Sequence, residues 1–333
     1  MNIISFFKIL ASLLYVFFIV LPLAGETNGS PQSETTYVFS VAPVSGFLYG
    51  QVKELVYKTT DSDTLLSQLS WDIKPLFLWG VSLDLNRRYP MEKMGFVTNL
   101  TAQFSFPAKT GIMEDRDWQA EGDQLSHFSS HDNYTNWAML AELNVGVSMP
   151  VISRMLFKFY TGFNYMYFRW AAQDGYSQYG TEIVSGVYSP WTENIPRVSQ
   201  YGLVIAYTQN WFIITPGISL YIPYRFFAVN IDFQISPLIF CLDQDNHPLR
   251  SPPLQFNDYM FGGLFLEPTG EFIFSLNEKI DLSAYVSYRF IKGPRGLTII
   301  KDLANNITVR DNNKAGAAYS ALSVGLSLKY KFR

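Results

Sequence analysis

Long stretches of the chain alternate apolar and polar residues with a period of two. In residues 322–332, Leu, Val, Leu, Leu, Tyr and Phe take every second position, and Ser, Gly, Ser, Lys and Lys lie between them. Successive side chains of a β-strand point to opposite faces, so such a strand has one apolar face and one polar face. Similar alternation appears at residues 137–148, 155–164, 227–236 and 280–290. The pattern predicts β-strands that lie between two different environments.

Strand length and aromatic residues indicate what those environments are. A soluble β-sandwich also alternates, but several stretches here exceed the ~5–6 residues of an average strand and approach the ~9–11 that a tilted strand needs to cross a bilayer. Aromatic residues make up 17% of the 333 residues and charged residues only 16%. Tyr, Trp and Phe crowd the ends of the stretches, as in interfacial girdles. Since only a closed barrel satisfies all strand backbone groups in lipid, we predict an all-β transmembrane barrel.

We expect ten antiparallel strands in this barrel, joined by alternately short and long connections. The long connections are expected at residues 118–133, 178–197, 243–255 and 301–315. Bacterial barrels keep short turns in the periplasm and long loops outside, so these four are predicted to be extracellular. The expected strands cover residues 36–58, 65–86, 94–117, 134–148, 154–177, 198–222, 226–242, 256–275, 279–300 and 316–332.

The N-terminus predicts export from the cytoplasm. Residues 1–25 carry Lys8 and then an apolar run that ends in small residues, which is the layout of a cleavable signal peptide. The run is about long enough to cross a membrane, so a permanent membrane helix is the alternative. We expect cleavage near Ala24 or Gly25, which leaves residues 26–333 as a single barrel domain.

Charge and cysteine content exclude some functions. The net charge is −3 and no long block of like charges occurs, so we expect no nucleic-acid partner. The single cysteine, Cys241, excludes an internal disulfide framework and a cysteine-based metal cluster.

Polar residues gather beyond the third and seventh expected strands. Asp115 and Asp117 belong to the first group, and Asp245 and His247 to the second. Four strand steps in a ten-stranded ring are close to a diameter, so the two pairs should face each other across the barrel mouth. The carboxylate of Asp245 can accept a hydrogen bond from one imidazole nitrogen of His247. The other nitrogen is then free to take a proton from water. The neighbouring aspartates should titrate as a coupled pair, able to polarise water or to donate to an oxyanion.

Other interpretations of these residues stay open. Acidic residues in an exposed loop are usually solvated by water and have no catalytic role. Residues 243–254 begin like a calcium loop, but Pro248 replaces the turn glycine and Leu254 the bidentate glutamate, so we reject calcium. A single histidine among carboxylates would bind zinc weakly, and we expect no metal. Ser129 and His131 permit a serine hydrolase, although no Gly-x-Ser-x-Gly motif is present. These two residues and Met113 are secondary candidates.

Six segments carry a resemblance to a known family. They are KELVY (53–57), LSQLSWD (66–72), IMEDRDW (112–118), SSH (129–131), DQDNH (243–247) and GLSLKYKF (325–332). In this order they resemble the omptin family of outer-membrane endoproteases. The resemblance implies a ten-stranded barrel whose rim activates water for peptide hydrolysis, with neither a covalent intermediate nor a metal. It assigns Asp115 and Asp117 to an Asp-Asp couple, and Asp245 and His247 to an Asp-His dyad.

The resemblance also implies a substrate class. Glu54 and Asp243 match the acidic pocket that binds the basic residue before the scissile bond in omptins. Two carboxylates in a confined cleft favour Arg or Lys, and Arg can pair in a bidentate manner. The expected partners are peptides or proteins with exposed basic residues. We expect a monomer in the outer membrane of a Gram-negative-type bacterium, with the active site facing the exterior.

A lipid site follows from the same resemblance. Tyr165 and Arg169 match the site through which omptins bind lipopolysaccharide, which their activity needs, and a cation there could meet lipid phosphate. Tyr167 stands where the family usually has an acid, which puts the dependence on lipid in question. We expect no cofactor other than lipopolysaccharide. The other departures from the family pattern are Arg116, Asn246 and Arg333.

A non-enzymatic outer-membrane barrel, acting as an adhesin or a narrow pore, is the alternative function. The pore is the weaker form, because about ten strands enclose a lumen mostly filled by side chains. Peptide hydrolysis that depends on His247 separates the enzyme from both forms.

Overall fold

The computed structural model describes residues 36–58, 63–89, 94–151 and 155–332 of the chain. Residues from Thr36 onward form one compact unit. The predicted signal segment, residues 1–25, and the first ten residues of the predicted barrel domain lie outside the described residues.

Antiparallel β-strands make up most of the described chain. The only other regular element there is η1, a three-residue 3₁₀ turn at Glu121–Asp123. No helix in the described part of the chain is long and apolar enough to cross a membrane. The strands are β1 (Thr36–Tyr57), β2 (Leu65–Tyr89), β3 (Gly95–Ser105), β4 (Ala108–Asp117), β5 (His127–Pro150), β6 (Leu156–Tyr179), β7 (Glu182–Val184), β8 (Val187–Tyr188), β9 (Val198–Ser199), β10 (Leu203–Tyr224), β11 (Phe227–Ser236), β12 (Leu238–His247), β13 (Leu254–Phe261), β14 (Leu264–Ser275), β15 (Ile280–Asp302) and β16 (Ile307–Lys331).

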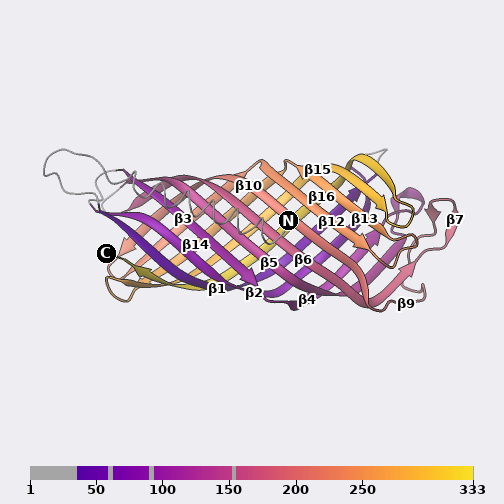
Figure 1. The fold of residues 1–333 in the computed structure, drawn as a ribbon, viewed down its shortest axis with the longest axis horizontal. Helices are drawn as coiled ribbons and strands as arrows, with labels where there is room; N and C mark the ends of the chain where they lie inside the picture. Colours follow the sequence, from indigo (N-terminus) through magenta and orange to yellow (C-terminus); the bar gives the residue numbers. More distant parts are fainter. Residues whose placement is uncertain (1–35, 59–62, 90–93, 152–154, 333) are drawn as a thin grey trace. The chain divides into compact units, whose positions relative to one another are not determined.

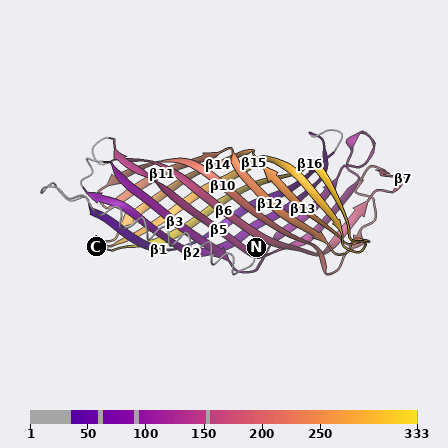
Figure 2. The same cartoon turned by 45° about the horizontal axis from the view of Figure 1, so that its top comes forward.

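The main sheet closes into a ring. Hydrogen-bonded neighbours lead from β10 through β11, β14, β15, β16, β1, β2, β3 and β5 to β6, and β6 pairs with β10 again. The first and last long strands are joined from Ser40 opposite Lys331 to Val56 opposite Ala315. Figures 1 and 2 show these strands running obliquely, and Figure 1 shows β7 and β9 at one end of the ring. Ring closure leaves the long strands paired on both sides, which removes the free edges of an open sheet.

The described residues contain sixteen strands where ten were expected. Three expected strands are each divided in two, as β3 and β4, β11 and β12, and β13 and β14, and three short strands, β7 to β9, precede β10. Pro107 and Pro237 lie at the first two breaks, where a residue without a backbone N–H interrupts the ladder. Gly262 and Gly263, both with positive φ, lie at the third.

Three of the expected loops are shorter than predicted. β5 begins at His127, β12 continues to His247 and β16 begins at Ile307, so much of the expected loops 118–133, 243–255 and 301–315 is strand. The strand ends there carry polar residues on both faces, as at residues 243–247, so the apolar alternation stops before the hydrogen-bonded ladder does. Asp243, Asp245 and His247 therefore lie on a strand and share one face of it.

An aromatic layer fills the middle of the ring. We use this name for Trp71, Phe168, Trp170, Tyr207 and Tyr319, all of which are buried. The rings of Trp71, Trp170 and Tyr207 stack mutually, with centroids 5.1–5.9 Å apart, and Phe168 stacks on Trp170 at 4.9 Å. Such contacts stabilise a core beyond the burial of apolar area alone.

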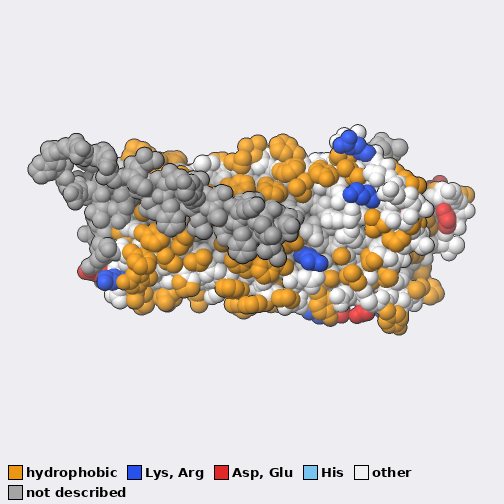
Figure 3. Space-filling view, in the orientation of Figure 1, with side chains coloured by type: hydrophobic (Ala, Val, Ile, Leu, Met, Phe, Trp, Pro, Cys, Tyr) orange, Lys and Arg blue, Asp and Glu red, His pale blue; other side chains and the backbone are white. Residues whose placement is uncertain are grey.

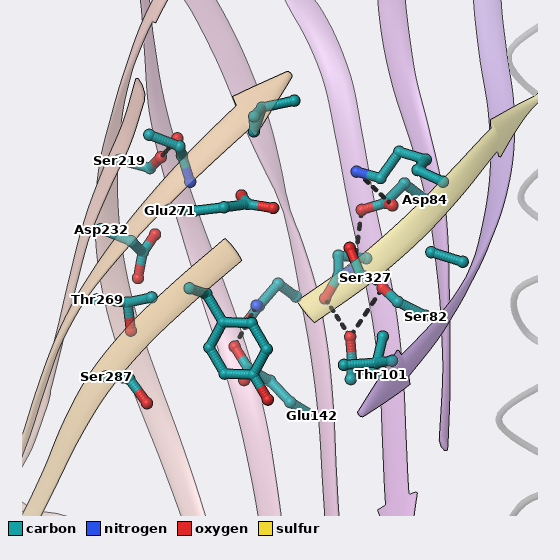
Figure 4. Close-up of a pocket in the computed structure, with 18 of the residues that line it drawn as sticks. Ser82, Asp84, Thr101, Glu142, Ser219, Asp232, Thr269, Glu271, Ser287 and Ser327 are labelled. Atoms are coloured by element: carbon teal, nitrogen blue, oxygen red, sulfur yellow. Dashed lines mark hydrogen bonds and ion pairs between the residues drawn. The ribbon is translucent and has the colours of Figure 1, made fainter. Parts of the chain in front are cut away.

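Cavities lie on both sides of this layer. The larger, which we call the lumen cavity, has a volume of about 820 Å³ and is lined on β1 and β2 by residues such as Val38, Ser40 and Asp84. Figure 4 shows polar side chains, among them Asp84 and Asp232, around it. The smaller, the rim cleft, is lined on the same two strands by Glu54 and Ser67. On β2 the buried Trp71 lies between the two sets of lining residues.

The outer wall is apolar along much of its length. On β16, Leu322, Val324, Leu326 and Leu328 are 41–54% exposed, so their face of the strand points outward. Figure 3 shows hydrophobic side chains over the visible wall, while the Lys and Arg side chains in view lie mostly toward the end that carries β7 and β9. The period-two alternation in the sequence therefore predicted the outward face of these strands correctly.

We expect the aromatic layer to contribute to the stability of the folded protein. Trp71→Ala should lower the free energy of unfolding by about 3 kcal/mol, because it empties a large buried site. Trp79→Ala is the matched control, since Trp79 is 46% exposed on the outer wall, and it should cost less than about 1 kcal/mol. Denaturant unfolding in detergent, followed by far-ultraviolet circular dichroism, measures both. Equal losses in the two variants would contradict the buried role of Trp71.

Candidate active site

The rim cleft brings together residues that are distant in the sequence. Its volume is about 140 Å³. Among its lining residues are Glu54 from β1, Asp117 from β4, Asp245 and His247 from β12, and Asp258 from β13. Of the four residues predicted to face each other, Asp117, Asp245 and His247 thus line one cleft, and Asp115 is not among its lining residues.

Asp245 and His247 form a hydrogen-bonded pair. The Nε2 atom of His247 bonds to Oδ2 of Asp245, and both side chains are buried. Because an ionised carboxylate only accepts, this bond places the proton on Nε2 and leaves Nδ1 as the basic nitrogen. The ring of Phe256 meets the imidazole edge-on at 5.5 Å and fixes its plane. The pair therefore has the geometry of an oriented general base.

Asp115 and Asp117 point to the same side of β4. Asp115 is buried and accepts a hydrogen bond of 3.3 Å from the Ser67 hydroxyl, whereas Asp117 is half-buried at the cleft. Burial raises the pKa of Asp115 well above its usual range, and the charge of Asp117 raises it further. The charge of Asp245 acts in the same direction. The raised pKa favours the protonated form of Asp115, which can donate a hydrogen bond.

Glu54 and Asp243 are also buried near the cleft. The Tyr207 hydroxyl donates to Oδ2 of Asp243 at 2.8 Å, and Gln209 donates to Tyr207 at 2.8 Å. Trp211 completes this chain by donating to Gln209 at 2.7 Å. Burial raises the pKa of Glu54 well above its usual range, and the carboxylates of Asp245 and Asp243 add to the shift. Burial likewise raises the pKa of Asp243, with a contribution from the charge of Asp258.

Sequence reasoning missed Asp258. It is 2% exposed and lies directly opposite Asp243 in the β12–β13 ladder. Burial raises its pKa to about 7, and the charge of Asp245 adds to the shift. The positions of Phe256, Asp258 and Met260, two residues apart, indicate that they share one face of the strand. Only the pairing register with β12 places Asp258 beside Asp243. Tyr207 was missed for the same reason, since it lies opposite Asp245.

The secondary candidates do not line the rim cleft, although Ser129 lies directly opposite Asp115 in the β4–β5 ladder. Met113 is fully buried in the hydrophobic core. His131 donates from Nδ1 to the Asp174 carbonyl at 2.5 Å, so its Nε2 accepts the Ser129 hydroxyl at 2.9 Å. Burial lowers the pKa of His131, which favours this neutral form. No group of three or more His, Cys, Asp or Glu in the described residues has the arrangement of a metal site.

Two of the departures from the family pattern point away from the cleft. Arg116 pairs with Glu114 at 2.9 Å and covers the ring of Phe128. Asn246 donates to the carbonyl of Ala206 and accepts from Gln255. Both have the opposite strand parity to the cleft residues. The third, Arg333, lies outside the described residues.

The predicted lipid site lies on the outer wall. Tyr165 donates its hydroxyl to Asn210 at 2.9 Å and packs on Phe212, so it is largely buried. Tyr167 is half-buried, and Arg169 is exposed at the same strand parity. Among the three, only Arg169 offers a charged group to a ligand at the surface.

Comparison with known proteins supports one family. The sequence model of the Omptin family matches residues 35–332. The fold is similar to the crystal structure of the outer membrane protease OmpT from Escherichia coli, with a TM-score of 0.80 and 17% identity over 90% of this chain and 99% of that chain. Comparison with curated proteins found no match.

Other solved barrels are less similar. The toluene transporter TodX of Pseudomonas putida matches with a TM-score of 0.25 and 8% identity, over 91% of each chain. A FadL homologue of Pseudomonas aeruginosa matches with a TM-score of 0.24 and 7% identity, over 89% of this chain and 91% of that chain. The likeness to OmpT shows the fold, and the family match extends over nearly the whole described chain. The chain belongs to the omptin family.

Proposed function

We propose that this omptin is an outer-membrane endopeptidase that hydrolyses peptide bonds after basic residues. Family membership and the OmpT-like fold support an outer-membrane protease. The observation that carries the finer proposal is the rim cleft, where the bonded pair Asp245 and His247 lies with Asp117 and Glu54. The chemistry is peptide hydrolysis by a water molecule, without a covalent intermediate.

In this proposal the ring crosses the outer membrane with ten membrane-spanning strands. Each divided strand counts as one of the ten. For example, β3 and β4 pair with the same two neighbours, β2 and β5, so they act as one strand that is interrupted at a proline. The exposed apolar residues supply the lipid-facing wall; on β1 they end at Tyr49, on β12 at Phe240 and on β15 at Tyr288. Glu54, Asp245 and the other cleft residues lie beyond this band. The long connection 180–202 lies at the same end, so we assign that end to the exterior.

Hydrolysis uses both sides of the cleft. Nδ1 of His247 takes a proton from water as the oxygen attacks the carbonyl carbon, and Asp245 stabilises the imidazolium that forms. Asp117 accepts a hydrogen bond from the same water. Asp115 keeps its proton and donates to the oxygen of the tetrahedral intermediate. When the C–N bond breaks, His247 returns the proton to the leaving amine.

Specificity arises from the acids beside the dyad. Glu54 and Asp243 are buried, and one oxygen of each has no hydrogen-bond partner among the described residues. A basic side chain would donate to these oxygens and restore the electrostatic balance. Substrates are therefore peptides or proteins with exposed Arg or Lys. The enzyme acts as a monomer, and lipopolysaccharide at Arg169 supports its active form.

The dyad can be tested with a fluorogenic dibasic peptide and protein purified in detergent with lipopolysaccharide. His247→Ala should lower kcat/KM by roughly 10²–10⁴-fold, which is the usual contribution of a general base. Glu114→Gln is the control and should change kcat/KM little, because Glu114 pairs with Arg116 on the outer face. A folded His247→Ala variant with undiminished activity would contradict the mechanism. A loss with Ser129→Ala as large as with His247→Ala would favour a serine nucleophile.

The acidic subsite can be tested with peptides that carry Arg or its neutral isostere citrulline before the scissile bond. Asp243→Asn should lower kcat/KM for the Arg peptide roughly tenfold, since hydrogen bonds to charged groups contribute about 1.5–3 kcal/mol. The citrulline peptide should be cleaved at a little-changed rate. Glu114→Gln is the control, because Glu114 pairs with Arg116 on the outer face. Equal losses for both peptides would show that Asp243 has a structural role instead.

The lipid site can be tested by titrating lipopolysaccharide into the lipid-free enzyme. Arg169→Ala should raise the concentration needed for half-maximal activity several-fold, because a guanidinium contact to phosphate is lost. Lys109→Ala removes an outer-wall cation that is already paired with Asp132 and should leave the titration unchanged. Full activity of the wild type without lipid would refute the requirement.

A further inference from the structure

We propose that Asp258 is a third carboxylate of the basic-residue subsite and makes it select a guanidinium over an ammonium group. The inference rests on the proposed function, because it needs a subsite for the residue before the scissile bond. It adds a residue to the two that the sequence indicated, and it narrows the substrate class from basic residues to arginine.

The strand register places Asp258 beside the other two acids. Asp258 lies opposite Asp243 on one side and opposite Thr298 of β15 on the other. Residues directly opposite in an antiparallel pair share a face, with Cβ atoms about 4.5–5.5 Å apart. Asp258 also lines the rim cleft together with Glu54 and Thr298. Glu54 and Asp258 thus border one small volume next to the dyad, and Asp243 is buried directly opposite Asp258.

Unpaired oxygens show that this volume is built to receive a donor. Among the described residues, the buried side chains of Glu54, Asp243 and Asp258 each leave one oxygen without a hydrogen-bond partner: Oε2, Oδ1 and Oδ1, respectively. Buried acceptors without a donor are rare in folded proteins because each costs the desolvation of its group. Three of them in and beside one cleft are explained by a ligand that brings several N–H groups.

A guanidinium fits this arrangement better than an ammonium. Its five N–H groups form a rigid planar fork, so two edges can pair with two carboxylates at the same time. Asp243 and Asp258 stand side by side, and Tyr207 already occupies Oδ2 of Asp243, so the free oxygens of the two acids are the ones offered. An ammonium is a compact, strongly hydrated point charge and gains less from a second, fixed carboxylate.

The subsite also makes cation recognition depend on pH. A neutral Asp258 offers no charge to the substrate, and an ionised one does. Since burial raises its pKa to about 7, selection of a cation strengthens as the pH rises through that value and weakens as it falls. The charged or titratable groups that line the same cleft from the surrounding elements are Glu54, Asp117, Asp245, His247, Arg250 and Lys314, with Asp243 facing Asp258 across the ladder.

The test compares peptides that differ only in the residue before the scissile bond, which is Arg, citrulline or Lys. In the wild type, the ratio of kcat/KM for Arg to that for citrulline should rise between about pH 6 and about pH 8. Proton transfers common to all substrates cancel in this ratio. In Asp258→Asn the ratio should fall roughly tenfold at the higher pH. Its rise with pH should be smaller than in the wild type but not absent, because burial also raises the pKa of Glu54 and of Asp243. The preference for Arg over Lys should fall as well.

Matched variants separate this role from a structural one. Asp258→Glu should restore part of the ratio and its pH dependence. Glu114→Gln, on the outer face of the same rim, should behave as the wild type. Migration in unheated SDS gels reports the folded barrel, and Asp258→Ser supplies a smaller uncharged variant if Asp258→Asn does not fold. A wild type that cleaves no peptide refutes the proposed function. A wild type that prefers Arg, with the same ratios in folded Asp258→Asn or Asp258→Ser, refutes the role of Asp258 alone.

Discussion

Closure of the antiparallel strands into a ring is the constraint from which the rest of the structure follows. Once β1 pairs with β16 and β6 with β10, every long strand has two neighbours and directly opposite residues must share a face. Period-two alternation then sends one set of side chains to the outer wall and the other into the lumen. Residues from four different strands, such as Glu54, Asp117, Asp245 and Asp258, meet in one cleft only because of this geometry.

Charge pairing distinguishes the two cavities inside the ring. In the lumen cavity, acids face cations, as in Asp84 with Lys329 at 3.0 Å and Glu267 with Arg289 at 2.6 Å. At the rim, Glu54, Asp243 and Asp258 form no ion pair with any described residue. Because these three acids are buried, their mutual repulsion is poorly screened. Ion pairs within the chain thus neutralise acids of the lumen cavity such as Asp84 and Glu267, whereas no ion pair with a described residue neutralises Glu54, Asp243 or Asp258.

The long strands and the pairing of Asp245 with His247 could be predicted from the sequence, because both depend on local spacing. Asp245 and His247 are two residues apart on one strand, and their parity alone directs them to the same face. Register depends on pairing with distant residues, so no local pattern showed that Asp258 lies opposite Asp243. The predicted loop boundaries were wrong for a different reason. Residues 243–247 are polar on both faces of the strand, and a hydrogen-bonded ladder that projects into water needs no apolar alternation.

The aromatic layer also bears on the choice between an enzyme and a pore. Trp71, Trp170 and Tyr207 are 0% exposed and stack across the lumen between the two cavities. A chain or solute that entered the rim cleft would meet these rings, and separating them would cost the burial of three large side chains. Entry and exit therefore use the same opening, which suits a hydrolase whose substrate and products remain on one side. A conducting pore requires a continuous polar path, and the packing of these three residues interrupts it.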